Sequence, residues 1–185
     1  MNNTNSSTTE HTGPDVYFYS NIDAASVKEL HISLATAAQE AQGVGGAYNL
    51  GVVPAIKLHI SSFGGSLVHG FAAADFIQRS PAPVITIVEG VTASAATLLS
   101  LSGHRRLITP NSTMLIHQLT AAAWGKYSDL KEELDNLTKM MNLLEAFYLK
   151  RTKLTKKVLK DLLKRDVVFT AKECIKAGLA DFILG

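Results

Sequence analysis

Residues 84–96, with the sequence Val-Ile-Thr-Ile-Val-Glu-Gly-Val-Thr-Ala-Ser-Ala-Ala, decide the fold of this chain. The first five residues form a mostly apolar run, which is typical of a strand buried on both faces of a sheet. Gly90 is predicted to end this strand, and Ser94 then begins a run of small and apolar residues that is typical of a buried helix. A buried strand that leads through a turn into a helix is the unit from which parallel α/β sheets are built.

The same order of strand, turn and helix recurs on both sides of this segment. Strands are predicted at residues 16–19, 55–60, 84–88, 107–108 and 114–117. Helices are predicted at residues 23–42, 67–78, 94–102, 126–150, 155–163 and 170–177. The strongest helical period lies in residues 126–150, whose apolar positions are Leu130, Leu134, Leu137, Met141, Leu144 and Tyr148. Strands that alternate with helices predict an α/β fold with a largely parallel sheet.

The composition predicts one globular domain that follows a flexible tail. The chain has 185 residues, of which 46% are hydrophobic and 18% are charged, and this suffices for one packed core. Residues 1–15 are rich in Asn, Ser and Thr and contain no apolar stretch, so they are predicted to be a tail and not a signal peptide or anchor. Residues 16–185 form the predicted domain.

Charge and cysteine content narrow the possible functions. The net charge is +2, and no Lys/Arg run is interleaved with aromatic residues, so we expect no nucleic-acid partner. The basic residues in 150–164 alternate with Leu and Val, which is typical of a solvated helix face and not of a membrane site. Cys174 is the single cysteine and is predicted to be a small core residue. No Cys/His spacing predicts a metal or cofactor, and a reducing cytoplasm is the expected location.

Two glycine-containing turns carry the candidate chemistry. Gly64-Gly65-Ser66 follows one predicted strand, and Gly90 and Ser94 follow the next. A serine at the start of a helix lies beside unpaired backbone amides, which favour a developing negative charge. Glycine in a neighbouring turn lets a second amide approach the same point. The pattern is compatible with acyl transfer through an oxyanion.

Each candidate residue also has a structural interpretation. A serine at the start of a helix is more often an N-cap, and a histidine at the end of an apolar strand, such as His117, is more often a satisfied core residue. Asp166 follows Arg165 and would be explained equally well by a surface ion pair. Periodicity alone does not bring Ser94, His117 and Asp166 together.

Several motifs together resemble the ClpP family of self-compartmentalised serine peptidases, over about residues 16–184. The matching segments are Ile60-Ser61-Ser62-Phe63-Gly64-Gly65-Ser66, Gly90-Val91-Thr92-Ala93-Ser94-Ala95-Ala96, Pro110-Asn111-Ser112-Thr113-Met114-Leu115-Ile116-His117-Gln118, Arg165-Asp166 before Thr170-Ala171-Lys172-Glu173, and Ala177-Gly178-Leu179-Ala180-Asp181. Their order along the chain makes the resemblance specific, because the order Ser, His, Asp differs from three other known triad orders.

The resemblance implies a ClpP/crotonase-like fold and a role for each site residue. Ser94 would be the nucleophile, His117 the general base and Asp166 the residue that orients the imidazole. The backbone N–H groups of Gly65 and Ala95 would form the oxyanion hole. The substrate would bind as an added strand between residues 66–68 and 118–121, and the contacting residues would be Ser66, Leu67, Val68, Gln118 and Leu119.

The resemblance also implies an assembly and a partner. Residues 126–150 would be the handle that interlocks two stacked heptameric rings, and the substrates would be peptides or unfolded proteins. A AAA+ unfoldase is the family's partner, but residues 1–15 do not resemble the family's axial-loop segment, so this partner has less support than the peptidase chemistry. Such a short, divergent member would suit a phage-encoded homologue.

Other departures from the family pattern lie near the substrate groove. Phe63 and Leu119 replace prolines, and Ala121-Ala122 replaces glycines. These changes would reshape the substrate groove without touching the triad.

Three alternatives stay open: a non-catalytic ClpP-like scaffold subunit, a CoA-binding enzyme of the crotonase fold, and a capsid-maturation protease that needs no ATPase.

Overall fold

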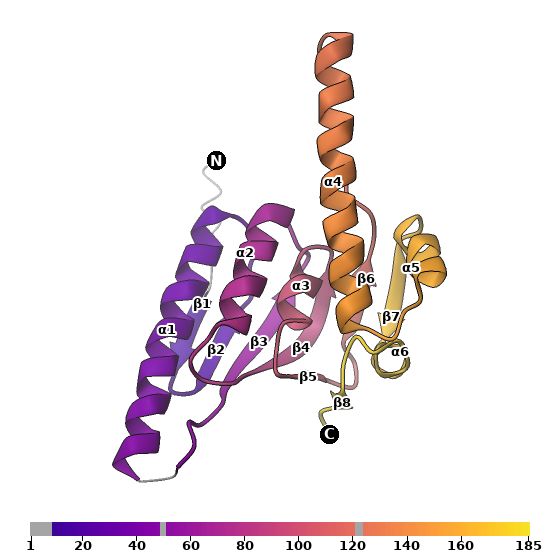
Figure 1. Cartoon of the computed structure of the whole chain (residues 1–185). Coiled ribbons are helices and arrows are strands. Elements are labelled where there is room, and N and C mark those ends of the chain that lie inside the picture. The colour runs from indigo at the N-terminus through magenta and orange to yellow at the C-terminus, as the bar shows by residue number, and fades with distance from the viewer. Residues whose placement is uncertain (1–8, 49–50, 121–123) are drawn as a thin grey trace, which may run out of the picture.

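The computed structural model describes residues 9–48, 51–120 and 124–185 as a sheet with helices packed against it and one helix that projects beyond it (Figure 1). The strands are β1 (Thr9–Thr12), β2 (Asp15–Phe18), β3 (Ile56–Ser62), β4 (Val84–Ala93), β5 (Arg105–Ile108), β6 (Thr113–Ile116), β7 (Val167–Thr170) and β8 (Phe182–Ile183). The helices are α1 (Ala24–Ala47), α2 (Leu67–Gln78), α3 (Ala96–Ser100), α4 (Tyr127–Arg151), α5 (Lys156–Leu163) and α6 (Ala171–Ala177).

The sheet is largely parallel, which confirms the predicted fold class. β2, β3, β4 and β5 are parallel neighbours, and β4 and β5 also pair in parallel with β6 and β8 respectively. Only the pairs β1–β2 and β6–β7 are antiparallel among the described strands. Helices α1, α2 and α3 lie side by side along this sheet (Figure 1). They bury the apolar positions of β3 and β4, such as Leu58 and Val88.

β4 is longer than the sequence indicates, and the prediction that it ends at Gly90 is wrong. Before Gly90 the strand pairs with β5, and after it residues Val91–Ala93 pair with β6. Gly90 has a φ of +66°, a left-handed conformation that glycine adopts at little cost. The glycine therefore lets β4 change neighbours and continue to Ala93, which places Ser94 beside β6.

The first helix also extends past its predicted end at Gly43. α1 continues to Ala47, and the N–H of Tyr48 then donates to the carbonyl oxygens of Val44 and Gly46. A glycine inside a helix costs about 1 kcal/mol relative to alanine but does not by itself end the helix. The remaining hydrogen bonds of the helix outweigh that cost here.

The predicted tail, residues 1–15, is partly ordered, so the domain begins earlier than expected. β1 pairs with β2 in register from Thr9↔Phe18 to Thr12↔Asp15, and Gly13, with a φ of +59°, forms the turn between them. Polar composition did not reveal this hairpin, because a strand at the edge of a sheet needs few apolar residues. Residues 1–8 lie outside the described part of the chain.

The projecting helix is α4, which agrees with the long helix predicted at residues 126–150. Its buried residues are Leu144, Phe147 and Tyr148, all in its last two turns. Further toward its N-terminus Leu134 is 63% exposed, although it belongs to the same apolar stripe. The outer part of α4 projects beyond the sheet and the other helices (Figure 1), so within the described residues the outer part of the stripe is left exposed.

Cys174 is a core residue, as predicted. It is fully buried, and its side chain contacts the carbonyl oxygen of Phe169 at 3.8 Å. Burial raises the pKa of its thiol to about 12, so it remains protonated at neutral pH. Such a thiol is a poor nucleophile.

Candidate active site

Ser94 lies on a strained turn between β4 and α3. Its φ is +55°, and it is the one non-glycine residue with a positive φ among those that the structure describes. The left-handed conformation of a non-glycine residue costs about 1–3 kcal/mol and persists only when its surroundings hold it. Residues held in this way cluster at functional sites, so the turn marks Ser94 as a candidate independently of any sequence motif.

The double-glycine turn after β3 packs directly against this serine. A Cβ atom on Gly64 would lie 2.6 Å from the Cβ of Ser94 and 3.0 Å from the backbone nitrogen of Ala95. A Cβ atom on Gly65 would lie 2.3 Å from the carbonyl oxygen of Ile22. Both glycines also have positive φ values, +96° and +146°. Only glycine fits this close approach of two backbone segments.

Ile22 fixes the double-glycine turn from the other side. Its N–H donates to the carbonyl oxygen of Gly64, and its own carbonyl accepts from the N–H of Ser66, both at 2.8 Å. The N–H of Gly65, which lies between these two bonds, has no partner among the described residues, and neither has the N–H of Ala95. Two unpaired main-chain donors therefore lie at the Ser94 turn, where they could stabilise a developing negative charge.

Ser94 and His117 face the same cavity of about 250 Å³. The N–H of Ser94 donates to the carbonyl oxygen of Leu115 at 2.9 Å, which ties the serine to β6 two residues before the histidine. The cavity is lined by Gly65, Leu67, Ser94, Ala95, His117, Gln118, Leu119, Thr120, Leu144 and Tyr148. Of the predicted site residues, Asp166, Ser66 and Val68 are outside this lining.

Asp166 is close to His117 along the sheet, but the two side chains are not bonded. Strands β6 and β7 are antiparallel, and their last aligned pair is Ile116↔Val167. One step further in this register His117 is opposite Asp166, a position in which neighbouring side chains are normally within reach. Asp166 is nevertheless exposed, and no hydrogen bond joins His117 to Asp166 or to Ser94 within the described ranges.

The imidazole of His117 is held by its own neighbour in the chain. Its Nδ1 lies 2.6 Å from the carbonyl oxygen of Gln118. A carbonyl oxygen only accepts, so Nδ1 is the donor in this bond, and in the singly protonated ring the lone pair is on Nε2. This is the tautomer that a general base needs.

The substrate was expected to bind as an added strand between residues 66–68 and residues 118–121, and the structure shows the following local conformation at each segment. Leu67 and Val68 form the first turn of α2, and Ser66 is its N-cap, with its hydroxyl 2.9 Å from Nδ1 of His69. The chain turns into a helix at this point because the side chain of Ser66 accepts a hydrogen bond from the N–H of His69, an amide that has no partner within the helix. On the other side, the N–H of Gln118 donates to the carbonyl oxygen of Leu163 at 2.9 Å. Ala121 and Ala122 lie outside the described residues.

Two residues that line the cavity were not predicted as site residues from the sequence. Tyr148 and Leu144 were assigned only to the apolar stripe of the long helix, yet both reach the cavity beside Ser94. The hydroxyl group of Tyr148 was the available signal, because a buried tyrosine in an apolar stripe needs a hydrogen-bond partner.

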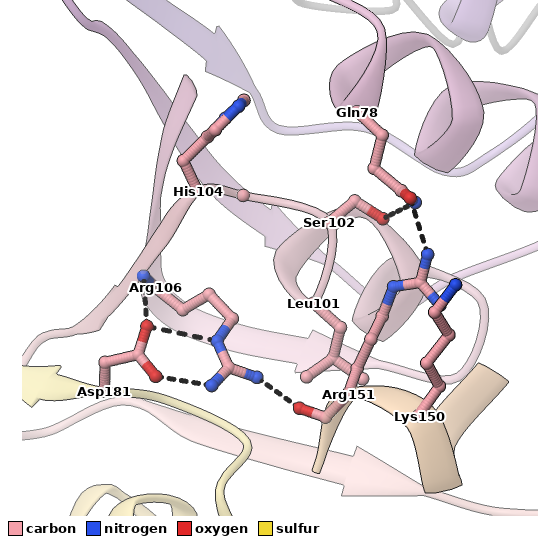
Figure 2. A pocket seen from close by; sticks show the side chains of 9 residues that line it. Gln78, Leu101, Ser102, His104, Arg106, Lys150, Arg151 and Asp181 are labelled. Carbon is pink, nitrogen blue, oxygen red and sulfur yellow. Dashed lines mark hydrogen bonds and ion pairs between the residues drawn. The ribbon is translucent and has the colours of Figure 1, made fainter. Parts of the chain in front are cut away.

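A larger cavity of about 530 Å³ lies at the C-terminal ends of α2 and α4, but its polar groups have structural roles (Figure 2). Arg106 pairs with Asp181, and its Nη1 donates to the carbonyl oxygens of Arg151 and Gly178 at 2.6 and 2.9 Å. Arg151 donates to Oε1 of Gln78 at 2.6 Å. Burial by itself would raise the pKa of Asp181, but the hydrogen bonds and the charge of Arg106 lower it by more. The pKa of Asp181 therefore lies below its usual value. These groups brace helix ends, and we assign no chemistry to them.

Metal-binding groups and membrane-spanning helices were also sought among the described residues. Over residues 9–48, 51–120 and 124–185, no group of three His, Cys, Asp or Glu side chains is arranged to hold a metal ion. None of the helices described for this chain has the length and apolar character needed to cross a membrane.

Fold and site together define an α/β protein in which a strained serine and a histidine share a cavity with two free main-chain donors. The family model described as Clp protease matches residues 52–185. The chain is 35% identical over 129 residues to a Protochlamydia amoebophila protein named ATP-dependent Clp protease proteolytic subunit 1. The aligned region covers 68% of this chain and 63% of that protein. The chain belongs to the Clp protease family, and the match spans somewhat less than two thirds of its relative's length.

The packing of the double-glycine turn predicts the effect of a single methyl group. Gly64→Ala should lower the free energy of unfolding by about 2 kcal/mol or more, because the new Cβ meets Ser94 and the backbone is left-handed. Gly43→Ala is the matched control, because nothing lies within 4 Å of its Cβ in α1, and it should raise stability by about 0.5–1 kcal/mol. Urea unfolding of the three proteins measures both effects. A Gly64→Ala protein as stable as wild type would contradict the observed packing.

Proposed function

We propose that this chain is a serine endopeptidase that hydrolyses peptides and unfolded proteins through an acyl-enzyme. Ser94 is the nucleophile, His117 the general base and Asp166 the carboxylate that orients the base. The observation that carries the proposal is the strained turn of Ser94, which lies in one cavity with His117 and beside the free N–H groups of Gly65 and Ala95. Membership of the Clp protease family supports it.

The proposed reaction uses these groups in two halves. Nε2 of His117 accepts the proton of the Ser94 hydroxyl as its oxygen attacks the scissile carbonyl, and the resulting oxyanion accepts hydrogen bonds from Gly65 and Ala95. Losing one such donor costs on the order of 3 kcal/mol in the transition state. The imidazolium then protonates the leaving amine. Water, activated by the same imidazole, hydrolyses the ester on Ser94.

The role of Asp166 requires one rearrangement of a side chain. In the structure Nδ1 of His117 donates to Gln118, and the proposed active form exchanges this carbonyl for the carboxylate of Asp166. The register of β6 and β7 supports the exchange, because it aligns the two residues on adjacent strands. The backbone can stay in place while the imidazole and the carboxylate adopt other rotamers.

A fluorophosphonate probe tests the nucleophile. Wild-type protein should be labelled once per chain and should hydrolyse short fluorogenic peptides, whereas Ser94→Ala should fold but lose both reactions, because the proposed nucleophile is then missing. Mass spectrometry of the labelled peptide locates the adduct. An unlabelled, inactive wild-type protein would instead indicate a non-catalytic scaffold subunit, and binding of acyl-CoA without peptide turnover would indicate a crotonase-like enzyme.

Substitution of the carboxylate tests its assignment. Asp166→Asn should lower kcat/KM by about four orders of magnitude, because an amide favours the wrong tautomer of His117. Asp161→Asn is the matched control: this exposed carboxylate pairs with Arg165 at 2.5 Å on the surface of α5, so its loss should change the rate little. Steady-state peptide hydrolysis compares the variants. A silent Asp166→Asn beside a slow Asp161→Asn would show that the other carboxylate is the catalytic one.

The uncovered stripe of α4 supports a ring-shaped oligomer as the working form. A second copy of the chain can cover it with the same apolar residues, as the stacked rings expected from the family would require. The named relative is ATP-dependent, and we extend this to the chain as part of the proposal: a AAA+ unfoldase would deliver folded proteins, while short peptides would enter without it.

One charge on the stripe tests this assembly. Leu134→Asp should shift the protein to smaller species, because a carboxylate would be buried where copies of α4 meet. Asn136→Asp adds the same charge at an exposed α4 position off the stripe and should leave the assembly intact. Sedimentation velocity at matched concentration measures both. Equal distributions for the two variants would contradict the proposed role of α4.

A further inference from the structure

A chain of buried hydroxyl groups connects the projecting helix to the Ser94 turn. Tyr148, in the last turn of α4, is 1% exposed, and its hydroxyl forms a short hydrogen bond with Oγ1 of Thr97 in α3. Oγ1 of Thr97, which is also fully buried, in turn contacts the carbonyl oxygen of Ser94 at 2.6 Å. Ser94 and Tyr148, the two ends of this bridge, both line the cavity described above.

The direction of each hydrogen bond in this bridge follows from the donor inventory. The carbonyl oxygen of Ser94 can only accept, so the single hydroxyl proton of Thr97 points toward it. Tyr148 must then donate to Thr97. Burial raises the pKa of the Tyr148 phenol to about 12, so this donor keeps its proton throughout the neutral range. The direction of donation is therefore fixed: Tyr148 donates to Thr97, and Thr97 donates to the carbonyl oxygen of Ser94.

The carbonyl at the end of the bridge belongs to the same peptide group as a predicted oxyanion donor. The C=O of Ser94 and the N–H of Ala95 share one planar peptide unit, and the described residues include no cis peptide bond. In a trans peptide these two groups point in opposite directions, so an anchor on the oxygen also sets the direction of the N–H. A carbonyl that accepts hydrogen bonds also polarises its amide, which makes the N–H a stronger donor.

This peptide needs more anchoring than a regular helix start provides. Ser94 is left-handed, and the N-cap of α3, Ala95, has no side chain that could satisfy the first helical amides. Apart from the hydroxyl of Thr97, the carbonyl oxygen of Ser94 accepts from the N–H of Thr97 at 3.0 Å. The hydroxyl of Thr97, which is fully buried, therefore provides a second hydrogen bond that holds the strained peptide in place.

We propose that Thr97 and Tyr148 are positioning residues, which aim the N–H of Ala95 at the oxyanion through the carbonyl group of Ser94. This inference rests on the proposed peptidase function of Ser94. Neither side chain touches the reacting atoms. Their effect is to keep one donor of the oxyanion hole oriented before substrate arrives, so that no reorganisation is needed when the charge develops.

The test compares variants that remove hydroxyl groups but keep shape. Thr97→Val has nearly the same shape as threonine and should lower kcat for short peptides by about 100-fold with little change in KM, as expected when an oxyanion donor is lost. Thr97→Ser keeps the hydroxyl and should recover most of the rate. Tyr148→Phe leaves the bond from Thr97 to Ser94 in place and should lower kcat by about 3–10-fold, through lost polarisation alone.

A double variant separates positioning from stability. Thr97→Val alone leaves the buried hydroxyl of Tyr148 without a partner, which can destabilise the fold. Thr97→Val combined with Tyr148→Phe leaves no buried hydroxyl unpaired and loses only the bond to Ser94, so the protein should unfold within about 5 °C of the wild-type temperature and yet remain slow. Tm from calorimetry and the rate of fluorophosphonate labelling are measured on the same samples.

The outcomes distinguish the two proposals. An active wild-type protein with a slow, stable double variant and a rescued Thr97→Ser supports the positioning role. An active wild-type protein whose double variant has wild-type kcat overturns that role and leaves the peptidase proposal intact. A slow Thr97→Ser also overturns it, because the hydroxyl is then not what matters. A wild-type protein that neither labels nor hydrolyses peptides overturns both.

Discussion

The close approach of the Gly64–Gly65 turn to Ser94 is the constraint on which the rest of the site depends. A methyl group at Gly64 would lie closer to Ser94 than real carbon atoms ever do, so the two backbone segments are in contact with no side chain between them. This contact requires β4 to continue past Gly90 and to reach β6, and it requires Ile22 to hold the glycine turn on its far side. Gly65, Ser94 and Ala95 then line the same cavity.

A strained serine in such a contact has to be stabilised by its surroundings. The left-handed conformation of Ser94 costs of order 1–3 kcal/mol, and several ordinary interactions offset it. The N–H of Ser94 bonds to β6, and its carbonyl oxygen bonds to the amide and the hydroxyl of Thr97. Each such bond contributes about 1 kcal/mol, so together they match the strain. The turn is therefore held by neighbours on β6, α3 and α4 and not by its own sequence, which lacks the glycines often found around a nucleophile.

The sequence predicts the local parts of this arrangement better than the long-range ones. Helical periodicity located α2 and α4, and the apolar run at residues 84–88 identified the central strand, because these signals depend on neighbours in the chain. The resemblance to ClpP supplied the candidate triad and the family, and the comparisons confirmed the family. The change of strand partners at Gly90 and the bridge from Tyr148 to Thr97 were not predictable, because they join segments that periodicity does not relate. The left-handed φ of Ser94 was equally hidden, since serine rarely adopts it.

The resting position of His117 follows from a competition between two acceptors for one proton. The carbonyl of Gln118 is adjacent in the chain, so a bond to it costs little conformational entropy. Asp166 offers a charge and hence a stronger bond, but it is exposed, and water solvates its carboxylate and weakens its attraction for the imidazole. In the proposed peptidase, a carboxylate of Asp166 that is shielded from water would bind the imidazole more strongly, because the interaction of a carboxylate with an N–H donor strengthens as the local dielectric falls. In the proposed peptidase, the register of β6 and β7 aligns the histidine and the aspartate on adjacent strands, and their bond then depends on how strongly the exposed carboxylate is screened by solvent.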